Sequence, residues 1–319
     1  MSLFTFSYSP ILEQMQPLAK QFKDLYPNQI DFGTRVVQAL QLHHTVLAFA
    51  HTQCGKTGSM LAAIHLSNIP LSRVFLITGL SSIDWLVQTK KRIPMRNIFH
   101  RNTLHLFFKA IASVQDPLVL IDECHIASKP GQIIHKVTSD VNAKFVLVSA
   151  TPDWKRFDPL PDGVAIRVMK DPPKYISVDH FTENNQLLQC KNISNHPDAL
   201  DHIREIIPFL QKPAYHIIRT PRNELHEMTI ANFKSVFPQY PLLSMPNLSI
   251  LSEPPTTHTF IFIKDTLRCA VTIPKPYIGV LYDRFTRFPN RSSIIQGLLG
   301  RATGFESGHI VVFSYPDMV

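Results

Sequence analysis

The stretch FAHTQCGKTGSM, residues 49–60, decides the fold of this chain. It overlaps the end of the apolar run TVLAFA, which is typical of a buried strand, and it leads into TGSMLAAIHLS, whose apolar residues recur at helical spacing. A turn between such a strand and a helix lets backbone N–H groups and the helix N-terminus hold the phosphates of a nucleotide. In that arrangement Lys56 would pair with the β and γ phosphates, and the Thr57 hydroxyl would bind Mg²⁺. The alternative is a surface turn whose lysine begins a helix, and Gly55, Lys56 and Thr57 alone do not decide between the two.

Apolar runs of strand length alternate with helical patterns after this loop. In the first half these runs are RVFLIT (73–78), PLVLID (117–122) and KFVLVSA (144–150). The same alternation resumes in the second half and ends with HIVVFSY (309–315). It is the β-α-β pattern of parallel strands that are covered on both faces. We therefore expect an α/β fold with two lobes, each a mostly parallel sheet flanked by helices.

The length of 319 residues suits two domains of ~150 residues each. Between them the sequence becomes rich in Pro, Asp and Gly, as in PDWKRFDPLPDG (152–163) and KDPPK (170–174), which is typical of a connector. We expect an N-terminal lobe over 1–155, a linker over 156–174 and a C-terminal lobe over 175–319. The run VAIRVMK (164–170) inside the linker could be an edge strand.

Composition excludes several classes of protein. No apolar run reaches the ~18 residues that span a bilayer, and the first residues lack a signal-peptide pattern, so we expect an intracellular protein without a membrane partner. The four cysteines, Cys54, Cys124, Cys190 and Cys269, are far apart, which predicts neither a disulfide framework nor a zinc site. The net charge of +8 favours a polyanionic partner.

Two acidic residues stand at the end of the strand PLVLID. Asp122 and Glu123 stand at the carboxyl end of a parallel strand, where they can face the same crevice as the phosphate loop. Asp122 could hold Mg²⁺, and Glu123 could orient or deprotonate an attacking water. An acidic pair alone is more often a solvated loop, but its position after a Gly-Lys-Thr loop favours the functional interpretation.

Two later motifs complete a series. SATP (149–152) ends the next strand, and QGLLGRATG (296–304) lies near the end of the second half. The phosphate loop and DECH (122–125) resemble motifs I and II of superfamily 2 helicases of the DExH type, and SATP and QGLLGRATG resemble motifs III and VI. The resemblance extends over residues 35–301. The resemblance implies two RecA-like lobes with an ATP cleft between them. Other phrases, such as LITGLSSIDWLVQT and YIGVLYDR, look similar to compact helicase-like proteins of large double-stranded DNA viruses.

The phosphate loop and motif VI each depart from the family pattern. Gln53 stands where a glycine is usual, so phosphate binding requires a local φ that suits a residue with a Cβ. In motif VI, Gln296 stands one residue too far from Gly300, and Gly304 replaces the usual second arginine. Hydrolysis could therefore be slow, or an upstream arginine could substitute. The candidates for that substitution are Arg284, Arg287 and Arg291.

The resemblance also implies a role for each candidate site residue. The expected catalytic residues are Glu123, Lys56 and the arginine finger Arg301. The expected ATP-binding residues are Gln53, Cys54, Gly55, Lys56, Thr57 and Gly58, with Thr57 and Asp122 on Mg²⁺. Gln38 could read adenine, or it could be an ordinary exposed helix residue. The residues expected to couple ATP to nucleic acid are His125, Ser149, Thr151 and Gln296.

Loops at strand ends are expected to hold the nucleic-acid backbone. The candidates are Thr78, Gly79, Arg101, Arg219, Arg222, Lys264 and Arg268, each with an alternative as an ordinary loop residue. Trp85 and Phe99 could stack on bases, although core packing is the more frequent role.

The leading hypothesis is an ATP-dependent and Mg²⁺-dependent helicase or translocase that acts on nucleic acid, with DNA favoured over RNA. One alternative is a double-strand DNA translocase or packaging-type ATPase. Another is a non-catalytic nucleic-acid-binding protein with a degenerate helicase fold. We expect a monomer whose specificity a protein partner could supply, located in the host cytoplasm, nucleus or virion if the chain is viral.

Overall fold

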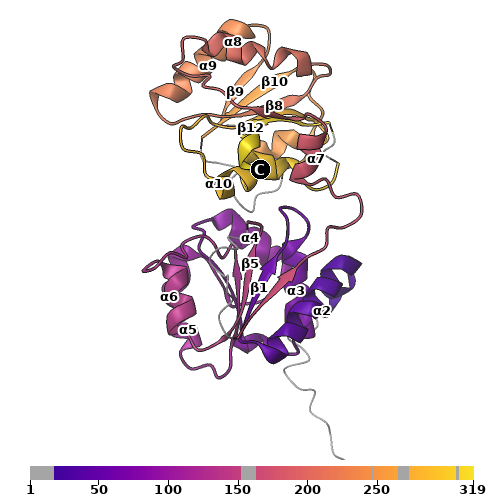
Figure 1. The fold of residues 1–319 in the computed structure, drawn as a ribbon, viewed down its shortest axis with the longest axis vertical. Coiled ribbons are helices and arrows are strands. Elements are labelled where there is room, and N and C mark those ends of the chain that lie inside the picture. The colour runs from indigo at the N-terminus through magenta and orange to yellow at the C-terminus, as the bar shows by residue number, and fades with distance from the viewer. Residues whose placement is uncertain (1–17, 152–162, 246, 265–272, 307–308) are drawn as a thin grey trace, which may run out of the picture. The chain divides into compact units, whose positions relative to one another are not determined.

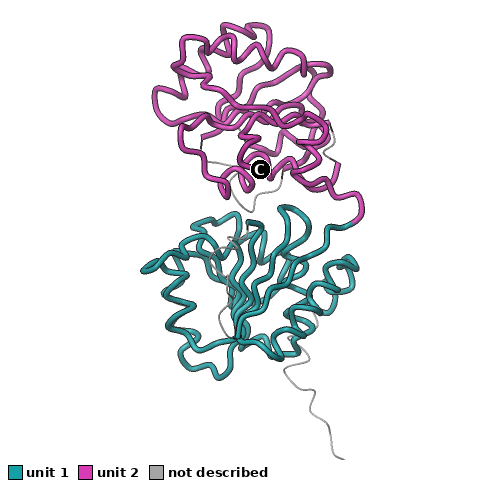
Figure 2. The backbone as a smooth tube through the Cα atoms, viewed as in Figure 1, with its two compact units in different colours: residues 1–172 teal, residues 173–319 magenta. Residues whose placement is uncertain are grey.

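The computed structural model describes residues 18–151, 163–245, 247–264, 273–306 and 309–319. The chain divides into two compact units, residues 1–172 and 173–319 (Figure 2). Each unit is described by itself.

The first unit is built on a six-stranded sheet with the order β3-β2-β4-β5-β1-β6, in which every pair of neighbours is parallel. Its strands are β1 (Thr45–Phe49), β2 (Val74–Thr78), β3 (Ile98–Phe99), β4 (Leu118–Asp122), β5 (Lys144–Ser149) and β6 (Val164–Val168). Its helices are α2 (Pro27–Leu42), α3 (Lys56–Leu66), α4 (Ile83–Arg92), α5 (Leu104–Ile111) and α6 (Ile133–Asp140). Helices α2 and α3 lie on one side of the sheet, and α5 and α6 lie on the other (Figure 1).

The central strands are buried along their whole length, as their apolar runs predict. All five residues of β2 and of β4 are buried, because helices cover both faces of the sheet. On the α5 side, the Phe107 ring packs edge-on against Phe75 of β2, with centroids 5.6 Å apart. The strand order places the ends of β1, β5, β4 and β2 in a row at one edge of the sheet. The phosphate loop, SATP, DECH and the candidate residues Thr78 and Gly79 lie at or just after the ends of these four strands.

The second unit has another six-stranded parallel sheet, with the order β7-β12-β11-β8-β10-β9. Its strands are β7 (Leu187–Gln189), β8 (Tyr215–Arg219), β9 (Leu242–Ser244), β10 (Thr259–Ile263), β11 (Ile278–Tyr282) and β12 (Val311–Ser314). Its helices are α7 (Val178–Glu183), α8 (Ala199–Arg204), α9 (Glu224–Val236), α10 (Arg291–Ile295) and α11 (Leu298–Ala302). An aromatic core forms where Phe233 of α9 meets Phe260 and Phe262 of β10, each with ring centroids 5.1 Å away.

The predicted fold class is confirmed: both units are parallel sheets flanked by helices. The segment 156–174, expected to be a linker, includes β6, which pairs with β1 as the edge strand that VAIRVMK allows. Among the described residues, no helix combines the length and the apolar character that crossing a membrane requires.

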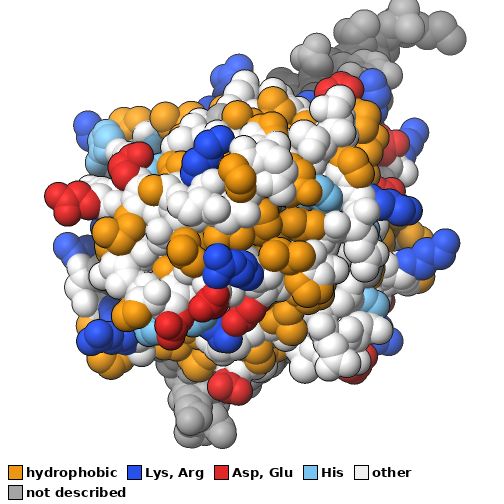
Figure 3. All heavy atoms as spheres, turned by 90° about the horizontal axis from the view of Figure 1, so that it is seen from above, with side chains coloured by type: hydrophobic (Ala, Val, Ile, Leu, Met, Phe, Trp, Pro, Cys, Tyr) orange, Lys and Arg blue, Asp and Glu red, His pale blue; other side chains and the backbone are white. Residues whose placement is uncertain are grey.

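Charge is mixed on the face of the second unit that bears α8 and α9. Figure 3 shows Lys, Arg, Asp and Glu side chains interspersed there with hydrophobic ones. The excess of positive charge in the sequence therefore does not gather into a single-sign patch on this face.

Candidate functional site

The phosphate loop occupies residues 50–55, between β1 and α3. Gly55 caps α3 with a left-handed backbone (φ 105°), which glycine adopts without steric cost. Gln53 is also left-handed (φ 59°). A residue with a Cβ is strained there, by about 1 kcal/mol. The local φ therefore does not suit glutamine, and the loop forms at a cost while Gln53 keeps its backbone N–H.

Gln29, in the first turn of α2, contacts this loop with its side-chain amide. Its Nε2 donates to the Gly55 carbonyl at 3.1 Å, and its Oε1 accepts from the Tyr26 N–H at 3.0 Å. A Cβ on Gly55 or Gly58 would overlap the Gln29 amide, so both glycines are needed for this approach. Glutamine at the third helical position is one half of a capping box, but the N-cap is Tyr26 and not Ser or Thr, so the sequence signal is weak.

Gln38, the expected adenine-reading residue, is exposed on the same helix. It lies nine residues after Gln29, which is about two and a half helical turns. Gln29, and not Gln38, is the α2 glutamine that contacts the phosphate loop.

The carboxylates of Asp122, the last residue of β4, and of Glu123, the next residue, lie beside the loop. Lys56 Nζ is 3.5 Å from Glu123 Oε1, and both side chains are nearly buried. Glu123 has a left-handed backbone (φ 50°), a strained conformation of the kind that collects at functional sites. The structure thus brings together the lysine of the first motif and the acid of the second.

Asp122 is buried, and two donors hold its carboxylate. Oδ1 accepts from the Glu123 N–H at 3.0 Å, and Oδ2 accepts from the indole Nε1 of Trp85 at 2.8 Å. Burial and then the neighbouring charge of Glu123 raise the pKa of Asp122 to about 6, against the opposing effects of Lys56 and the Trp85 hydrogen bond. A cation beside this carboxylate would favour its ionised form.

The expected coupling residues of the first unit form one chain of contacts. His125 Nδ1 is 3.7 Å from Glu123 Oε2 and 3.1 Å from Ser149 Oγ. Ser149 Oγ accepts from the Thr151 N–H at 3.1 Å. This chain exists because β5, which ends in Ser149, pairs with β4, so the SAT segment lies next to DECH.

Neither aromatic candidate is placed to stack on a base. Trp85 is 2% exposed and bonds Asp122, a role that its sequence position did not suggest. Phe99 packs edge-on against Phe107 at 6.1 Å between centroids, so its core alternative holds.

Three of the residues expected to contact nucleic acid are buried or nearly buried in the structure. Thr78 is fully buried, and its hydroxyl accepts from the Leu80 N–H. Gly79 is buried, and a Cβ there would overlap the Ile126 carbonyl. Arg219 is nearly buried in an ion pair with Asp283, with 2.9 Å between Nη1 and Oδ1.

The other expected contacts differ in exposure. Arg101 and Arg222 are exposed and Lys264 is half-buried, whereas Arg268 lies outside the described residues. The upstream arginines Arg284, Arg287 and Arg291 are exposed.

Motif VI forms helix α11 and the turn after it. Arg301 is buried there, with Nη2 3.4 Å from the Gln296 carbonyl. Lys275 bonds the carbonyls of Thr303 and Phe305, and burial followed by the charge of Arg301 lowers its pKa to about 8. Gly304 is left-handed (φ 104°), a conformation that glycine adopts without steric cost, so this turn favours glycine at the position where the sequence pattern leads one to expect an arginine.

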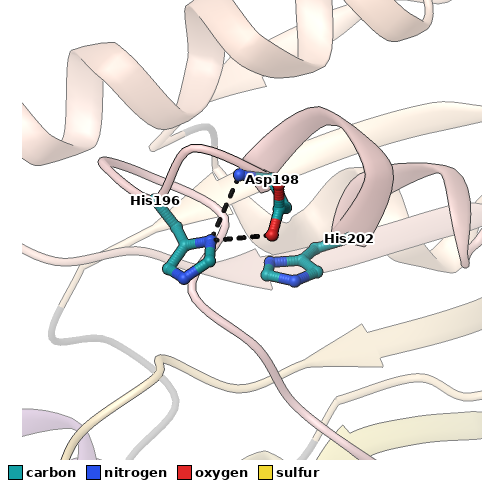
Figure 4. A group of neighbouring side chains, drawn as sticks. All are labelled: His196, Asp198 and His202. Atoms are coloured by element: carbon teal, nitrogen blue, oxygen red, sulfur yellow. Dashed lines mark hydrogen bonds and ion pairs between the residues drawn. The ribbon is translucent and has the colours of Figure 1, made fainter.

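A group of possible metal ligands lies on the second unit. His196, Asp198 and His202 place one ligand atom each within 4.8 Å of the others (Figure 4). His196 Nδ1 accepts from the Asp198 N–H at 3.2 Å, and His202 Nδ1 donates to the Asn192 carbonyl at 2.9 Å. These bonds join the His196 ring to the N-cap of α8 and the His202 ring, in α8, to the loop before it, and we assign no metal to the group.

No protein-family model matches the chain. The chain is similar to the uncharacterized protein L594 of Acanthamoeba polyphaga mimivirus, with 25% identity over 325 residues, which cover 87% of this chain and 81% of that protein.

Solved helicase structures resemble the fold. The Escherichia coli DExH-box NTPase HrpB matches 97% of this chain with a TM-score of 0.55 and 14% identity. Saccharomyces cerevisiae Dbp5, solved with RNA and ADP BeF3, matches 95% with a TM-score of 0.57 and 15% identity. The match spans 42% of the HrpB chain and 90% of the Dbp5 chain. These likenesses show that the fold is that of the tandem RecA-like lobes of superfamily 2 helicases.

Proposed function

We propose that the chain is a nucleic-acid-dependent ATPase of the superfamily 2 helicase type, which couples hydrolysis of Mg²⁺-ATP to movement along a strand. The observation that carries this proposal is the approach of Lys56 Nζ to Glu123 Oε1, 3.5 Å apart at the carboxyl edge of the first sheet. A lysine on the phosphate side and an acid on the water side are the two groups that phosphoryl transfer to water requires.

The residues fit Mg²⁺ and a nucleotide. Asp122 and Thr57 offer a carboxylate and a hydroxyl, which are the hard oxygen ligands that Mg²⁺ prefers. The loop approaches Gln29 so closely at Gly55 and Gly58 that side chains there would overlap its amide. Mg²⁺ bound to ATP would neutralise charge that develops on the phosphates during hydrolysis.

The side chains of the first unit then take distinct roles. Lys56 exchanges its contact with Glu123 for the phosphates, and Glu123 orients the attacking water and accepts its proton. A shift of the Glu123 side chain is transmitted through its contact with His125 to Ser149 and Thr151 at the end of β5. Gln29 takes the adenine-reading role expected of Gln38, because each of its polar atoms can make a second hydrogen bond.

Arg301 of the second unit is the proposed arginine finger, and the Gln296 carbonyl accepts a hydrogen bond from its guanidinium group. Arg101, Arg222, Lys264 and Arg268 remain the proposed contacts to the nucleic-acid backbone. DNA stays the proposed track, although the Dbp5 structure contains RNA. The DExH subtype, viral origin, monomeric state, intracellular location and a specificity-giving protein partner are likewise part of the proposal.

One specific observation favours the non-catalytic alternative, which is the strained Gln53 in the phosphate loop. That alternative predicts ATP binding without turnover, so binding and hydrolysis must be measured separately.

The test compares binding of a fluorescent ATP analogue with ATP hydrolysis in three variants. Lys56→Ala should lose binding, whereas Glu123→Gln should keep binding and lose at least about 100-fold in turnover. Lys90→Ala, which removes an exposed lysine of α4, is the matched control. Normal turnover in Glu123→Gln, or normal binding in Lys56→Ala, would contradict the proposal.

A further inference from the structure

Trp85 places its one polar atom on the proposed metal carboxylate. It lies in the first turn of α4, 2% exposed, and its indole Nε1 donates to Asp122 Oδ2 at 2.8 Å. A buried indole N–H requires an acceptor, and a carboxylate is among the strongest acceptors that a protein offers.

The indole hydrogen bond is one of two that fix the carboxylate of Asp122. The other oxygen, Oδ1, accepts the Glu123 N–H at 3.0 Å. One donor on each oxygen stops the carboxylate from rotating about its bond to Cβ. An ionised carboxylate has about four acceptor positions, so lone pairs remain on both oxygens for a cation.

The backbone of Trp85 is fixed as well. Its N–H donates to Oγ of Ser82, the N-cap of α4, at 3.1 Å. Six residues before Trp85, Gly79 lies against the Ile126 carbonyl, so closely that a Cβ would overlap it. The chain from Gly79 to Trp85 therefore contacts the end of β4 and the residues after it at two points, and the indole makes one of these contacts.

We propose that Trp85 is a positioning residue that orients the Asp122 carboxylate toward the Mg²⁺ of the bound nucleotide. This inference rests on the proposed function. Phenylalanine would fill much of the same space, so the indole N–H is the feature that distinguishes positioning from packing. Hydrogen bonds that orient a metal ligand typically change metal affinity by about 10-fold to 100-fold when they are removed.

The experiment removes the N–H and keeps the shape. Trp85 is replaced by 3-benzothienylalanine, in which sulfur takes the place of the indole nitrogen. Affinity for a fluorescent, non-hydrolysable ATP analogue is measured with and without Mg²⁺, and the ratio of the two gives the contribution of the metal. We expect this ratio to fall about 10-fold to 100-fold, with metal-free affinity and melting temperature near those of the wild type. Trp85→Phe should behave similarly.

The same analogue at Trp154, the other tryptophan of the sequence, is the matched control and should leave the ratio unchanged. An unchanged ratio at Trp85 would overturn the inference, and so would a loss of melting temperature and metal-free affinity without a change in the ratio. A wild-type protein without any metal contribution would overturn it too. If the ratio falls as expected but the wild type hydrolyses no ATP, the inference stands and the proposed function fails.

Discussion

Gln53 is the residue at which this phosphate loop departs from the motif pattern expected from the sequence. Its φ of 59° belongs to a conformation in which a Cβ is strained. Gln53→Gly should therefore be about 1 kcal/mol more stable to urea than Gln53→Ala, because both changes remove the side-chain amide but only alanine keeps a Cβ. Equal stability of the two variants would show that the loop relaxes around the Cβ. Binding of the ATP analogue should survive in both.

His216 makes the second unit sensitive to acid. It is fully buried in β8, with Nε2 3.0 Å from His258 Nδ1, and burial, followed by His258, lowers its pKa to about 3. The unfolded chain binds a proton below about pH 6.5 and the folded chain does not, so this contribution to stability is complete above that pH. It falls by about 1.4 kcal/mol for each pH unit below it.

Urea unfolding at pH 7 and pH 5 checks this dependence. Far-UV circular dichroism follows the unfolding, because it reports the loss of the sheet that contains His216 together with the other secondary structure. His216→Gln should reduce the pH dependence, whereas the exposed His309→Ala should not. A loss of stability between pH 7 and pH 5 that is the same in His216→Gln would refute the assignment.

Site residues could be predicted from the sequence where they belong to a recognisable motif. Lys56, Asp122 and Glu123 follow strands that the sequence identifies, and parallel strands end at one edge. Gln29 and Trp85 could not be found in this way, because their partners lie on other elements, 26 and 37 residues away in sequence. For the same reason, the ion pair between Arg219 and Asp283 could not be predicted from the sequence.

At the scale of elements, helix α2 depends on a glycine. A Cβ on Gly33 would lie 2.5 Å from the Ala62 Cβ and 2.9 Å from the Ala63 nitrogen, both in α3. Gly33→Ala should push α2 away from α3, lower the free energy of unfolding by about 1–3 kcal/mol and weaken nucleotide binding, because Gln29 moves with the helix.

Ala62→Gly offers the matched test of that contact. Glycine within a helix costs about 1 kcal/mol alone, but it removes the methyl group that Gly33→Ala would strike. The double variant should therefore be more stable than the sum of the two single changes predicts. Simple additivity in urea unfolding would mean that α2 and α3 do not meet at this point.

Element types could be predicted from periodicity, and the strand order could not. The buried runs before the loop and before DECH read as parallel strands, which they are. Nothing in their residues says that β5 lies between β1 and β4, because that depends on how the crossover helices pack. This order is what places Ser149 beside His125.

At the scale of the whole molecule, we expect binding of the nucleic-acid backbone to depend on a few exposed arginines. Arg222→Gln should lower the magnitude of the slope of log affinity against log salt by about 1 for single-stranded DNA, because one phosphate contact is lost. Arg219→Gln should instead destabilise the second unit by about 3 kcal/mol, since it leaves Asp283 buried without its cation. Fluorescence anisotropy over a salt series and urea unfolding separate the two effects, and interchanged results would refute both assignments.

The measurement that tests the central claim most directly is the rate of ATP hydrolysis with Mg²⁺ by the purified chain, without polymer and then with single-stranded DNA, duplex DNA or RNA. Glu123→Gln is measured beside it. We predict that single-stranded DNA raises the rate several-fold and that Glu123→Gln abolishes it. A rate that no polymer changes, or one that survives in Glu123→Gln, would contradict the account of a nucleic-acid-dependent ATPase.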